Sequence, residues 1–306
     1  MIEEPVSNPI HSARALWMRF ETIHAVTYFG AESAEAAKAI GLDSWWKGYF
    51  AFRGAPFGYA TAGVYDAAFH SFSLSFVRRW VPAIWESTTP ELALIARSAA
   101  AALTLRRCAK DSALDLETLA AEANPAIEKV LKNCYWSGRP LFAANRDVAL
   151  PTDPVERLWQ LCTSLREHRG DGHVVASTAC GLSGLEAHAL IAVEQQNSFD
   201  DLARTRGWST EEWNVCLAHL QERGLVNRTA DWGITEFGRD MRRNIETMTN
   251  QLGTQPFNPR PNIESAYESM AELVAILDPL ARVVAESGTI RYPNPMGLPT
   301  VSAKPA

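Results

Sequence analysis

The chain has 306 residues, of which 47% are hydrophobic and 21% charged, and its formal net charge at pH 7 is −6. These fractions are typical of a soluble globular protein, and no apolar run approaches the ~18 residues that a membrane-spanning helix needs. We therefore expect no membrane partner and no secretory leader. The negative charge also argues against a protein that mainly grips the phosphates of nucleic acid.

The cysteines predict a reducing environment. They are odd in number, widely spaced and set in mostly apolar sequence, and no pair has the spacing of a structural metal site. We expect reduced core thiols in a cytoplasmic protein. The five are Cys108, Cys134, Cys162, Cys180 and Cys216.

Helical patterns dominate the first part of the chain, which we expect to form an N-terminal helical domain over residues 1–150. The first helix is predicted over residues 9–29, and its apolar stripe includes Glu21 and His24. The third predicted helix ends at a break that begins with Arg53. The other helical segments are predicted over residues 33–40, 44–52, 60–87 with a kink at Pro82, 90–108 and 114–134.

A charged run lies inside the second expected domain, residues 151–255. A helix beginning at Pro154 leads into this run, which spans residues 166–173, reads Arg-Glu-His-Arg-Gly-Asp-Gly-His and is flanked by apolar residues. Each of its two glycines costs about 1 kcal/mol in a helix interior, so we predict a bend here. The alternative is an uninterrupted helix whose charges form a structural ion-pair network. The bend would gather four side chains around a small space, namely His168, Arg169, Asp171 and His173.

Residues 198–254 have the element order of a winged helix. A first helix is predicted to end near Gly207, and Ser209 with Glu212 forms a capping box for the second. We therefore expect a mainly α fold, a multi-helix body that contains a winged-helix (helix-turn-helix) module. A second, degenerate helix-turn-helix near the N-terminus is an open alternative. Two short strands and a further helix complete the module, over residues 225–228 and 232–235 and from Thr235.

The charge of this module weighs against DNA binding. A DNA-reading second helix presents basic and amide side chains, whereas this one carries Glu211, Glu212 and Glu222 with Arg223 as its basic neighbour. Seven arginines and eight acidic residues over 198–243 leave a net charge of −1. We predict a packing or dimerisation scaffold, with a homodimer as one expected state, and DNA binding as the disfavoured alternative.

The third expected domain, residues 256–306, combines a helix around residues 264–286 with a proline-rich tail. We predict that this tail is extended over the surface or disordered. Its prolines are Pro293, Pro295, Pro299 and Pro305.

Several stretches together resemble a bacterial family labelled "helix-turn-helix family protein", and the resemblance extends to about Gly253. The charged run is its most specific part. The resemblance implies a helix-turn-helix fold and no particular activity. The stretches are Ile23–Val26, Trp46–Arg53, Gly138–Leu141, Leu165–His173 and Trp208–Trp213.

The leading functional hypothesis is a site for a small anionic or aromatic molecule in a tryptophan-rich helical interior, where the molecule is either held or converted by acid–base chemistry. Histidine exchanges protons near neutral pH, a carboxylate fixes its tautomer, and arginine binds anions. The predicted catalytic residues are His24, His168, Asp171 and His173. The predicted ligand-binding residues are Trp17, Glu21, Tyr28, Trp46, Arg53, Glu167 and Arg169.

Three alternatives stay open. The same residues can be ordinary core and ion-pair residues, or the chain can be a ligand-responsive winged-helix transcription regulator. A metal- or haem-dependent enzyme is the third, because Glu21 and His24 have a spacing found in di-iron bundles and Glu167, His168 and His173 could complete a mononuclear site. No spacing is diagnostic, so we assign no metal ligand and no cofactor.

Overall fold

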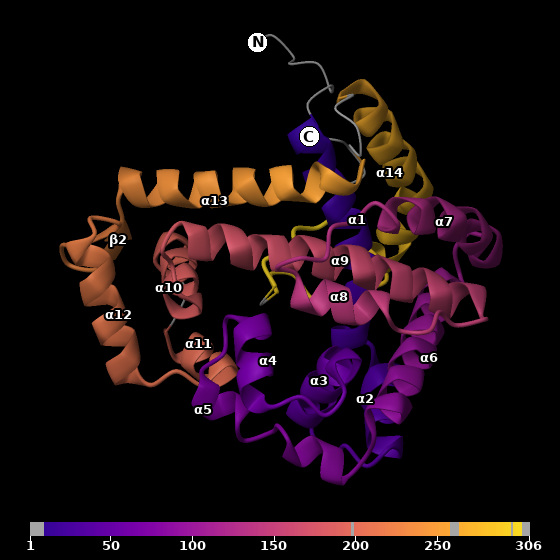
Figure 1. The fold of residues 1–306 in the computed structure, drawn as a ribbon, viewed down its shortest axis with the longest axis horizontal. Coiled ribbons are helices and arrows are strands. Elements are labelled where there is room, and N and C mark those ends of the chain that lie inside the picture. The colour runs from indigo at the N-terminus through magenta and orange to yellow at the C-terminus, as the bar shows by residue number, and fades with distance from the viewer. Residues whose placement is uncertain (1–8, 197–198, 258–262, 295, 302–306) are drawn as a thin grey trace. The chain divides into compact units, whose positions relative to one another are not determined.

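A computed structural model describes residues 9–196, 199–257, 263–294 and 296–301. These residues are mainly helical, with fourteen α-helices and one two-stranded antiparallel sheet (Figure 1). The mainly α fold predicted from the sequence is confirmed. Spatial contacts divide the chain into two compact units. Unit 1 comprises residues 1–58, 84–170 and 250–306, and unit 2 comprises residues 59–83 and 171–249.

Unit 1 is built around helices that share one apolar core. The core joins residues of α1, α6, α7, α9 and α14, among them the fully buried Ile23, Leu105, Ile127, Leu158 and Leu277. The helices assigned to unit 1 are α1 (Pro9–Phe29), α2 (Ala31–Ala39), α3 (Trp45–Gly54), α6 (Pro90–Ala109), α7 (Leu116–Leu131), α8 (Pro140–Arg146) and α14 (Ile263–Glu286), with the short turns η1 (Ala55–Phe57), η2 (Ala83–Glu86, which begins at the unit boundary) and η3 (Gln255–Phe257).

Local capping explains where the helices of unit 1 begin. The Thr89 side chain accepts a hydrogen bond from the backbone N–H of Leu92, and Pro90 occupies the first position of α6. The Ser44 side chain likewise accepts from the N–H of Lys47 at the start of α3. These side chains satisfy backbone donors that have no partner inside the helix, and so they fix the register of α3 and α6.

Helix α9 (Pro154–Ala179) passes through the charged run without a break, so the predicted bend is wrong. Glu167, His168, Arg169 and Asp171 are all buried, which confirms that the run is interior. Burial of the residues around the two glycines outweighs their helix propensity cost of about 1 kcal/mol each. The helix contributes its residues up to Gly170 to unit 1 and those that follow to unit 2.

Unit 2 contains the predicted helix-turn-helix. Ser209 and Glu212 form the expected capping box at the start of α12, and Trp213 and Leu217 bury one face of that helix. The two strands pair antiparallel, with Val226 opposite Ile234. This element order matches the predicted winged helix, and the winged-helix assignment stays a prediction. The elements are α4 (Ala62–Phe69), α5 (Leu74–Val77), α10 (Gly184–Gln195), α11 (Phe199–Arg206), α12 (Thr210–Glu222), β1 (Val226–Arg228), β2 (Trp232–Ile234) and most of α13 (Glu236–Thr254).

The described part of the C-terminal tail is packed rather than extended over the surface. Ile290, Leu298 and Val301 are buried, and the first two belong to the core of unit 1. The tail packs against the protein because this removes its apolar side chains from water. Pro295 and Pro305 lie outside the described residues.

The remaining expectations from the sequence concern the cysteines, membrane-spanning helices and domain ranges. All five cysteines are free thiols. No single helix in the described ranges is both long enough and apolar enough to cross a membrane. The three predicted domain ranges stay a prediction, and each of the two compact units combines segments that are distant in sequence.

Candidate functional site

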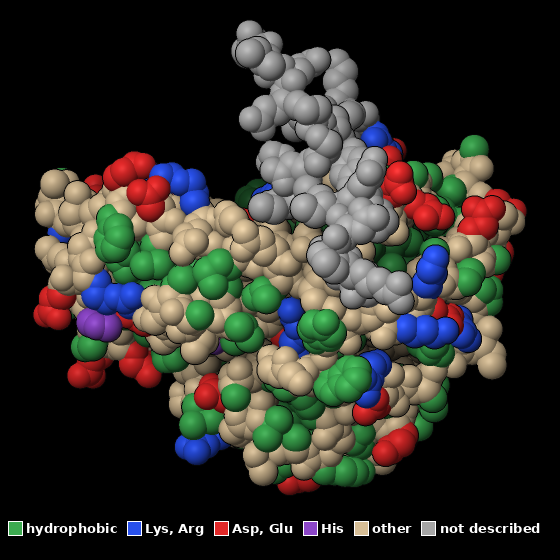
Figure 2. All heavy atoms as spheres, turned by 45° about the horizontal axis from the view of Figure 1, so that its top comes forward, with side chains coloured by type: hydrophobic (Ala, Val, Ile, Leu, Met, Phe, Trp, Pro, Cys, Tyr) green, Lys and Arg blue, Asp and Glu red, His purple; other side chains and the backbone are tan. Residues whose placement is uncertain are grey.

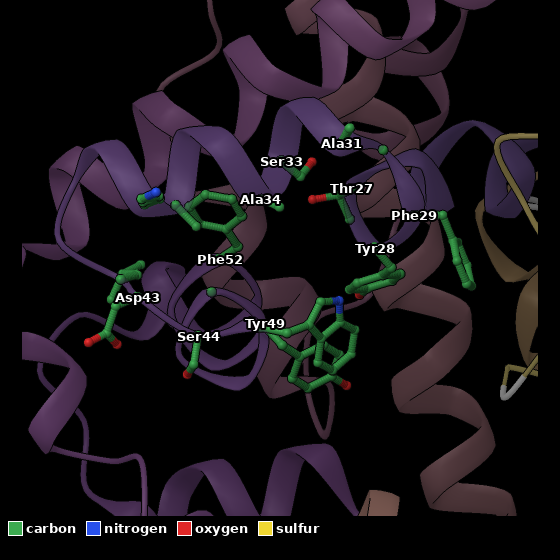
Figure 3. Close-up of a pocket in the computed structure, with 16 residues that line it drawn as sticks. Thr27, Tyr28, Phe29, Ala31, Ser33, Ala34, Asp43, Ser44, Tyr49 and Phe52 are labelled. Atoms are coloured by element: carbon green, nitrogen blue, oxygen red, sulfur yellow. The ribbon is translucent and has the colours of Figure 1, made fainter.

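A cavity of about 360 Å³ lies between α1, α2 and α3 of unit 1 (Figure 3). We call it the aromatic cavity. Its rim includes the exposed residues Ala34, Lys38 and Trp45, so it opens to solvent. It is lined by Thr27, Tyr28, Phe29, Gly30, Ala31, Ser33, Ala34, Ala37, Lys38, Leu42, Asp43, Ser44, Trp45, Gly48, Tyr49 and Phe52.

Flat rings form much of the wall of this cavity. The ring of Tyr49 stacks on Trp45 with centroids 5.3 Å apart and lies 5.5 Å from the ring of Tyr28. Figure 3 shows Tyr28, Tyr49 and Phe52 around the cavity. Such walls favour a planar apolar ligand, because aromatic rings gain from offset or edge contacts in addition to burial.

Two hydroxyl groups in the cavity wall are buried without a partner. The side chains of Thr27 and Ser33 are 9% and 6% exposed, and neither oxygen has a hydrogen-bond partner among the described residues. The Thr27 hydroxyl points from α1 toward the cavity in Figure 3. Each oxygen exposes less than 1 Å², so neither is open to the cavity, although most buried polar groups in proteins are hydrogen-bonded. Thr27 also lines a second, water-sized cavity.

Four charged side chains form what we call the ion-pair cluster: Glu21, Arg53, Arg166 and Glu167. Arg166 donates to Glu167 at 2.6 Å and to Glu21 at 3.2 Å. Arg53 lies 3.4 Å from the same Glu167 oxygen. Two arginines and two glutamates make the cluster neutral. A second cavity beside it has a volume of about 10 Å³, room for about one water molecule and no organic ligand.

The charges of the ion-pair cluster support one another. Burial by itself would raise the pKa of Glu167, but Arg166 and Arg53 outweigh that effect and hold its pKa below the usual value. Glu167 therefore stays ionised near neutral pH. A buried ion pair of this kind is expensive to break, because removal of one partner leaves the other charge uncompensated.

His24 links the ion-pair cluster to the aromatic cavity. Its Nδ1 lies 2.9 Å from the Thr163 hydroxyl, which itself donates to the carbonyl of Trp159. Thr163 must therefore accept from Nδ1–H, which leaves Nε2 to accept the hydroxyl proton of Tyr28 at 3.0 Å. Burial, followed by the charges of Arg166 and Arg53, lowers the pKa of His24 well below its usual value. The imidazole is neutral in this arrangement.

Arg97 completes the polar interior of unit 1. It is 2% exposed, and its guanidinium donates to the Phe52 carbonyl at 2.7 Å, Asn145 at 3.0 Å and Gln160 at 2.8 Å. Burial lowers the pKa of Arg97 to about 10, which still leaves it charged at neutral pH. Its bond to Phe52 ties the backbone of α3 to α6 and so supports one wall of the aromatic cavity.

The structure brings together Glu21, His24, Tyr28, Arg53 and Glu167 of the predicted site. Trp17 joins them, because its indole N–H donates to Glu21 at 3.1 Å. Trp46 packs edge-on against Tyr49 at 5.8 Å and does not line the cavity.

The other predicted residues lie elsewhere along α9. His168 packs edge-on against Phe142, and its pKa is lowered to about 3 by burial and then by Arg139. Arg169 lies 4.6 Å from the Trp17 ring and donates to Asn250 at 2.9 Å. The remaining two belong to unit 2, where Asp171 is buried and His173 Nδ1 lies 3.1 Å from the Thr249 hydroxyl.

No group of three or more His, Cys, Asp or Glu side chains in the described part of the chain is placed to hold a metal ion. The three residues predicted for a mononuclear site, Glu167, His168 and His173, each contact other partners. Glu167 is engaged by two arginines, while the rings of His168 and His173 contact Phe142 and Thr249.

Apart from Tyr28, the residues that line the cavity were not predicted from the sequence. Gly48 is one of them, because a Cβ there would lie 3.1 Å from the Cβ of Ala37, so the glycine lets α3 approach α2. Arg97 and Arg166 were also missed. An arginine inside the alanine-rich stretch of α6, away from the basic last turn, was the signal that could have identified Arg97.

Comparisons with known proteins give one match. A model of the family described as "Helix-turn-helix family" matches residues 13–291, which is most of the chain. No curated protein and no solved structure matches.

Proposed function

The chain belongs to a helix-turn-helix family, and we propose that it binds a small aromatic molecule in the aromatic cavity of unit 1. The observation that carries the proposal is a cavity of about 360 Å³ with aromatic walls and an open rim. This volume lies within the range of about 300–1,000 Å³ that is usual for small-molecule sites. The family match tests neither the importance of the motif at residues 166–173 nor a bacterial origin, so both stay predictions.

The polar groups next to the cavity favour binding over acid–base conversion. Burial lowers the pKa of His24, which bonds to the cavity residue Tyr28, and also the pKa of His168, which lies elsewhere on α9. Neither imidazole therefore changes charge near pH 7, where a histidine acid or base is most useful. Glu167 is held as a carboxylate by two arginines. The ion-pair cluster therefore supports α1, α3 and α9 as a rigid frame behind the ligand.

Binding of a probe to the wild type and to a variant whose cavity is filled by a larger side chain tests this proposal. Naphthalene is a suitable probe because it is flat, apolar and uncharged. We expect it to raise the melting temperature of the full chain and to change the total tryptophan fluorescence, to which Trp45, 54% exposed at the rim, contributes as one of ten tryptophans. Ala34→Phe fills the cavity from α2 and should abolish both effects. Ala39→Phe is the matched control, because Ala39 is exposed on the same helix and does not line the cavity.

Equal naphthalene effects in the wild type and Ala34→Phe would contradict the proposal, as would no effect in the wild type. Loss of the effects in both variants would show that the phenylalanine perturbs α2 rather than the cavity. The expected pattern is loss in Ala34→Phe alone.

A ligand-responsive transcription regulator is the second candidate, and the family match favours it. Charge weighs against it. Helix α12 contains no lysine or arginine, and Glu211, Glu212 and Glu222 are exposed on it. Figure 2 shows acidic and basic side chains interspersed among the described residues of the visible face, where no continuous basic area is seen.

Titration of labelled duplex DNA at about 150 mM salt tests the second candidate. We expect affinity no better than the micromolar-or-weaker range of nonspecific binding, because few phosphates can be neutralised. A nanomolar complex that depends on sequence would reverse the order of the two candidates.

A further inference from the structure

One face of helix α6 carries a row of exposed apolar side chains. Leu92, Ile95 and Leu103 are 50%, 66% and 57% exposed, and Ala96 and Ala99 between them are half-buried. The five residues are spaced by three and four positions, so they lie on one side of the helix. We call them the outer stripe. Other sides of α6 pack against α1 and α2 within unit 1 (Figure 1).

The outer stripe has the pattern of a helix-packing surface. Single apolar side chains are common on protein surfaces, but a contiguous group of them indicates contact with another molecule. Apolar residues at this spacing form the stripe by which one helix packs against another. Because this stripe is exposed, the helix that would cover it belongs to a partner.

The outer stripe is symmetric about Ala99. Ile95 lies four residues before Ala99, and Leu103 lies four residues after it. Two copies of α6 that cross antiparallel at Ala99 therefore place each Ile95 against the Leu103 of the other copy. The small side chain of alanine at the crossing point lets the two helix axes come close. A two-fold interface needs this self-complementarity.

The charges at the ends of α6 fit the same arrangement. Glu91 lies eight residues before Ala99, Arg107 lies eight residues after it, and Lys110 follows at the end of the helix. Glu91 and Lys110 are exposed and form no ion pair among the described residues, and Arg107 is 48% exposed although it pairs with Glu32 of its own chain. An antiparallel pair brings the acidic end of each helix beside the basic end of the other, whereas a parallel pair brings like charges together.

We propose that the chain forms a homodimer through the outer stripe, with the two α6 helices packed antiparallel about Ala99. The partner is a second copy of this chain, because the apolar and the charged groups are each matched at equal distances from one central residue. A different protein would need no such symmetry. One helix face is a small interface, so we expect a weak dimer that dissociates at roughly micromolar concentration. This proposal does not depend on the aromatic cavity.

Sedimentation of the full chain over a range of concentrations tests the proposal through the Kd of the dimer. Ile95→Glu should raise this Kd about 100-fold, because each interface contains Ile95 twice and we expect about a tenfold loss for each charge placed against an apolar partner. Val215→Glu is the matched control, since Val215 is also 66% exposed but lies on α12. It should keep the wild-type Kd.

Both substitutions are at exposed positions, so neither should change the melting temperature of the monomer much. If Ile95→Glu melts at a lower temperature than Val215→Glu, Leu103→Glu replaces it, because Leu103 is the residue that Ile95 meets in the dimer. The same rise in Kd is expected for Leu103→Glu.

Disulfide cross-linking tests the antiparallel register. Chains that carry Ile95→Cys are mixed with chains that carry Leu103→Cys, and the mixture is treated with oxidised glutathione. We expect more disulfide-linked dimer from the mixture than from either variant alone. The wild type gives the background from the native thiols, which include the half-buried Cys108 and Cys180.

Three outcomes would overturn the proposal. The first is a wild-type chain that stays monomeric at all concentrations. The second is a dimer whose Kd does not respond to Ile95→Glu, or responds equally to Val215→Glu, because its contact would then not depend specifically on the outer stripe. The third is more cross-linking of Ile95→Cys alone than of the mixture, which would reject the antiparallel register about Ala99.

Discussion

Glu167→Gln should destabilise unit 1 strongly, because Glu167 is the shared partner of two arginines. Its side chain is 2% exposed, and those of Arg53 and Arg166 are 12% and 16% exposed. Glutamine keeps the shape and one oxygen acceptor, but it turns charge-assisted hydrogen bonds into weaker neutral ones and leaves two arginines with one carboxylate, Glu21. We expect a loss of about 3 kcal/mol, at the lower end of what removal of a buried partner costs.

Glu128→Gln is the control for this measurement. Glu128 also pairs with an arginine, Arg157 at 2.7 Å, but the two side chains are 28% and 34% exposed. Partial exposure limits the contribution of such a pair to roughly 0–1 kcal/mol. Urea unfolding with one probe for each unit gives the readout, since two units need not unfold together. For a unit of about 200 residues, 3 kcal/mol corresponds to a fall in Tm of roughly 6–12 °C. Equal, small losses in both variants would refute the view that the ion-pair cluster is a buried frame.

Two predictions concern pH. Burial lowers the pKa of His168 to about 3 from a model-compound value of 6.5, so only the unfolded chain takes up this proton as the pH falls below about 6.5. Its contribution to the free energy of unfolding should be about 1.4 kcal/mol smaller at pH 5.5 than at pH 7.5, and His168→Gln should lose that part of the pH dependence; an unchanged slope would contradict it. The pKa of Glu167 is lowered, so its contribution is present above about pH 4.5 and is lost as the pH falls further. The difference between the wild type and Glu167→Gln should shrink below that pH, and a constant difference would argue against ionised Glu167.

Local signals made much of the fold predictable. The capping residues Ser209 and Glu212 predicted the start of α12, and Pro154 is the first residue of α9 as expected. The bend at residues 170–172 was wrong, because propensity costs of about 1 kcal/mol are small beside the burial of a long helix. Helix α8 was missed because its first residue, Pro140, comes two residues after Gly138, and a glycine and a proline so close together are equally typical of a turn.

The site was less predictable, because it depends on side chains distant in sequence. The stripe with Glu21 and His24 indicated a polar position inside α1, and the structure places both next to α9. The aromatic cavity gave no such signal. It depends on the close approach of α2 and α3 at Ala37 and Gly48, and sequence periodicity predicts which face of a helix is buried but not whether the opposing faces fill the space.

A crystal structure of the chain soaked with 6-bromo-2-naphthol tests the central claim most directly, since anomalous scattering from bromine locates the probe independently of any other density. We predict a single strong bromine peak inside the aromatic cavity between α1, α2 and α3. A bromine peak elsewhere on the chain, with this cavity unoccupied at saturating probe, would contradict it.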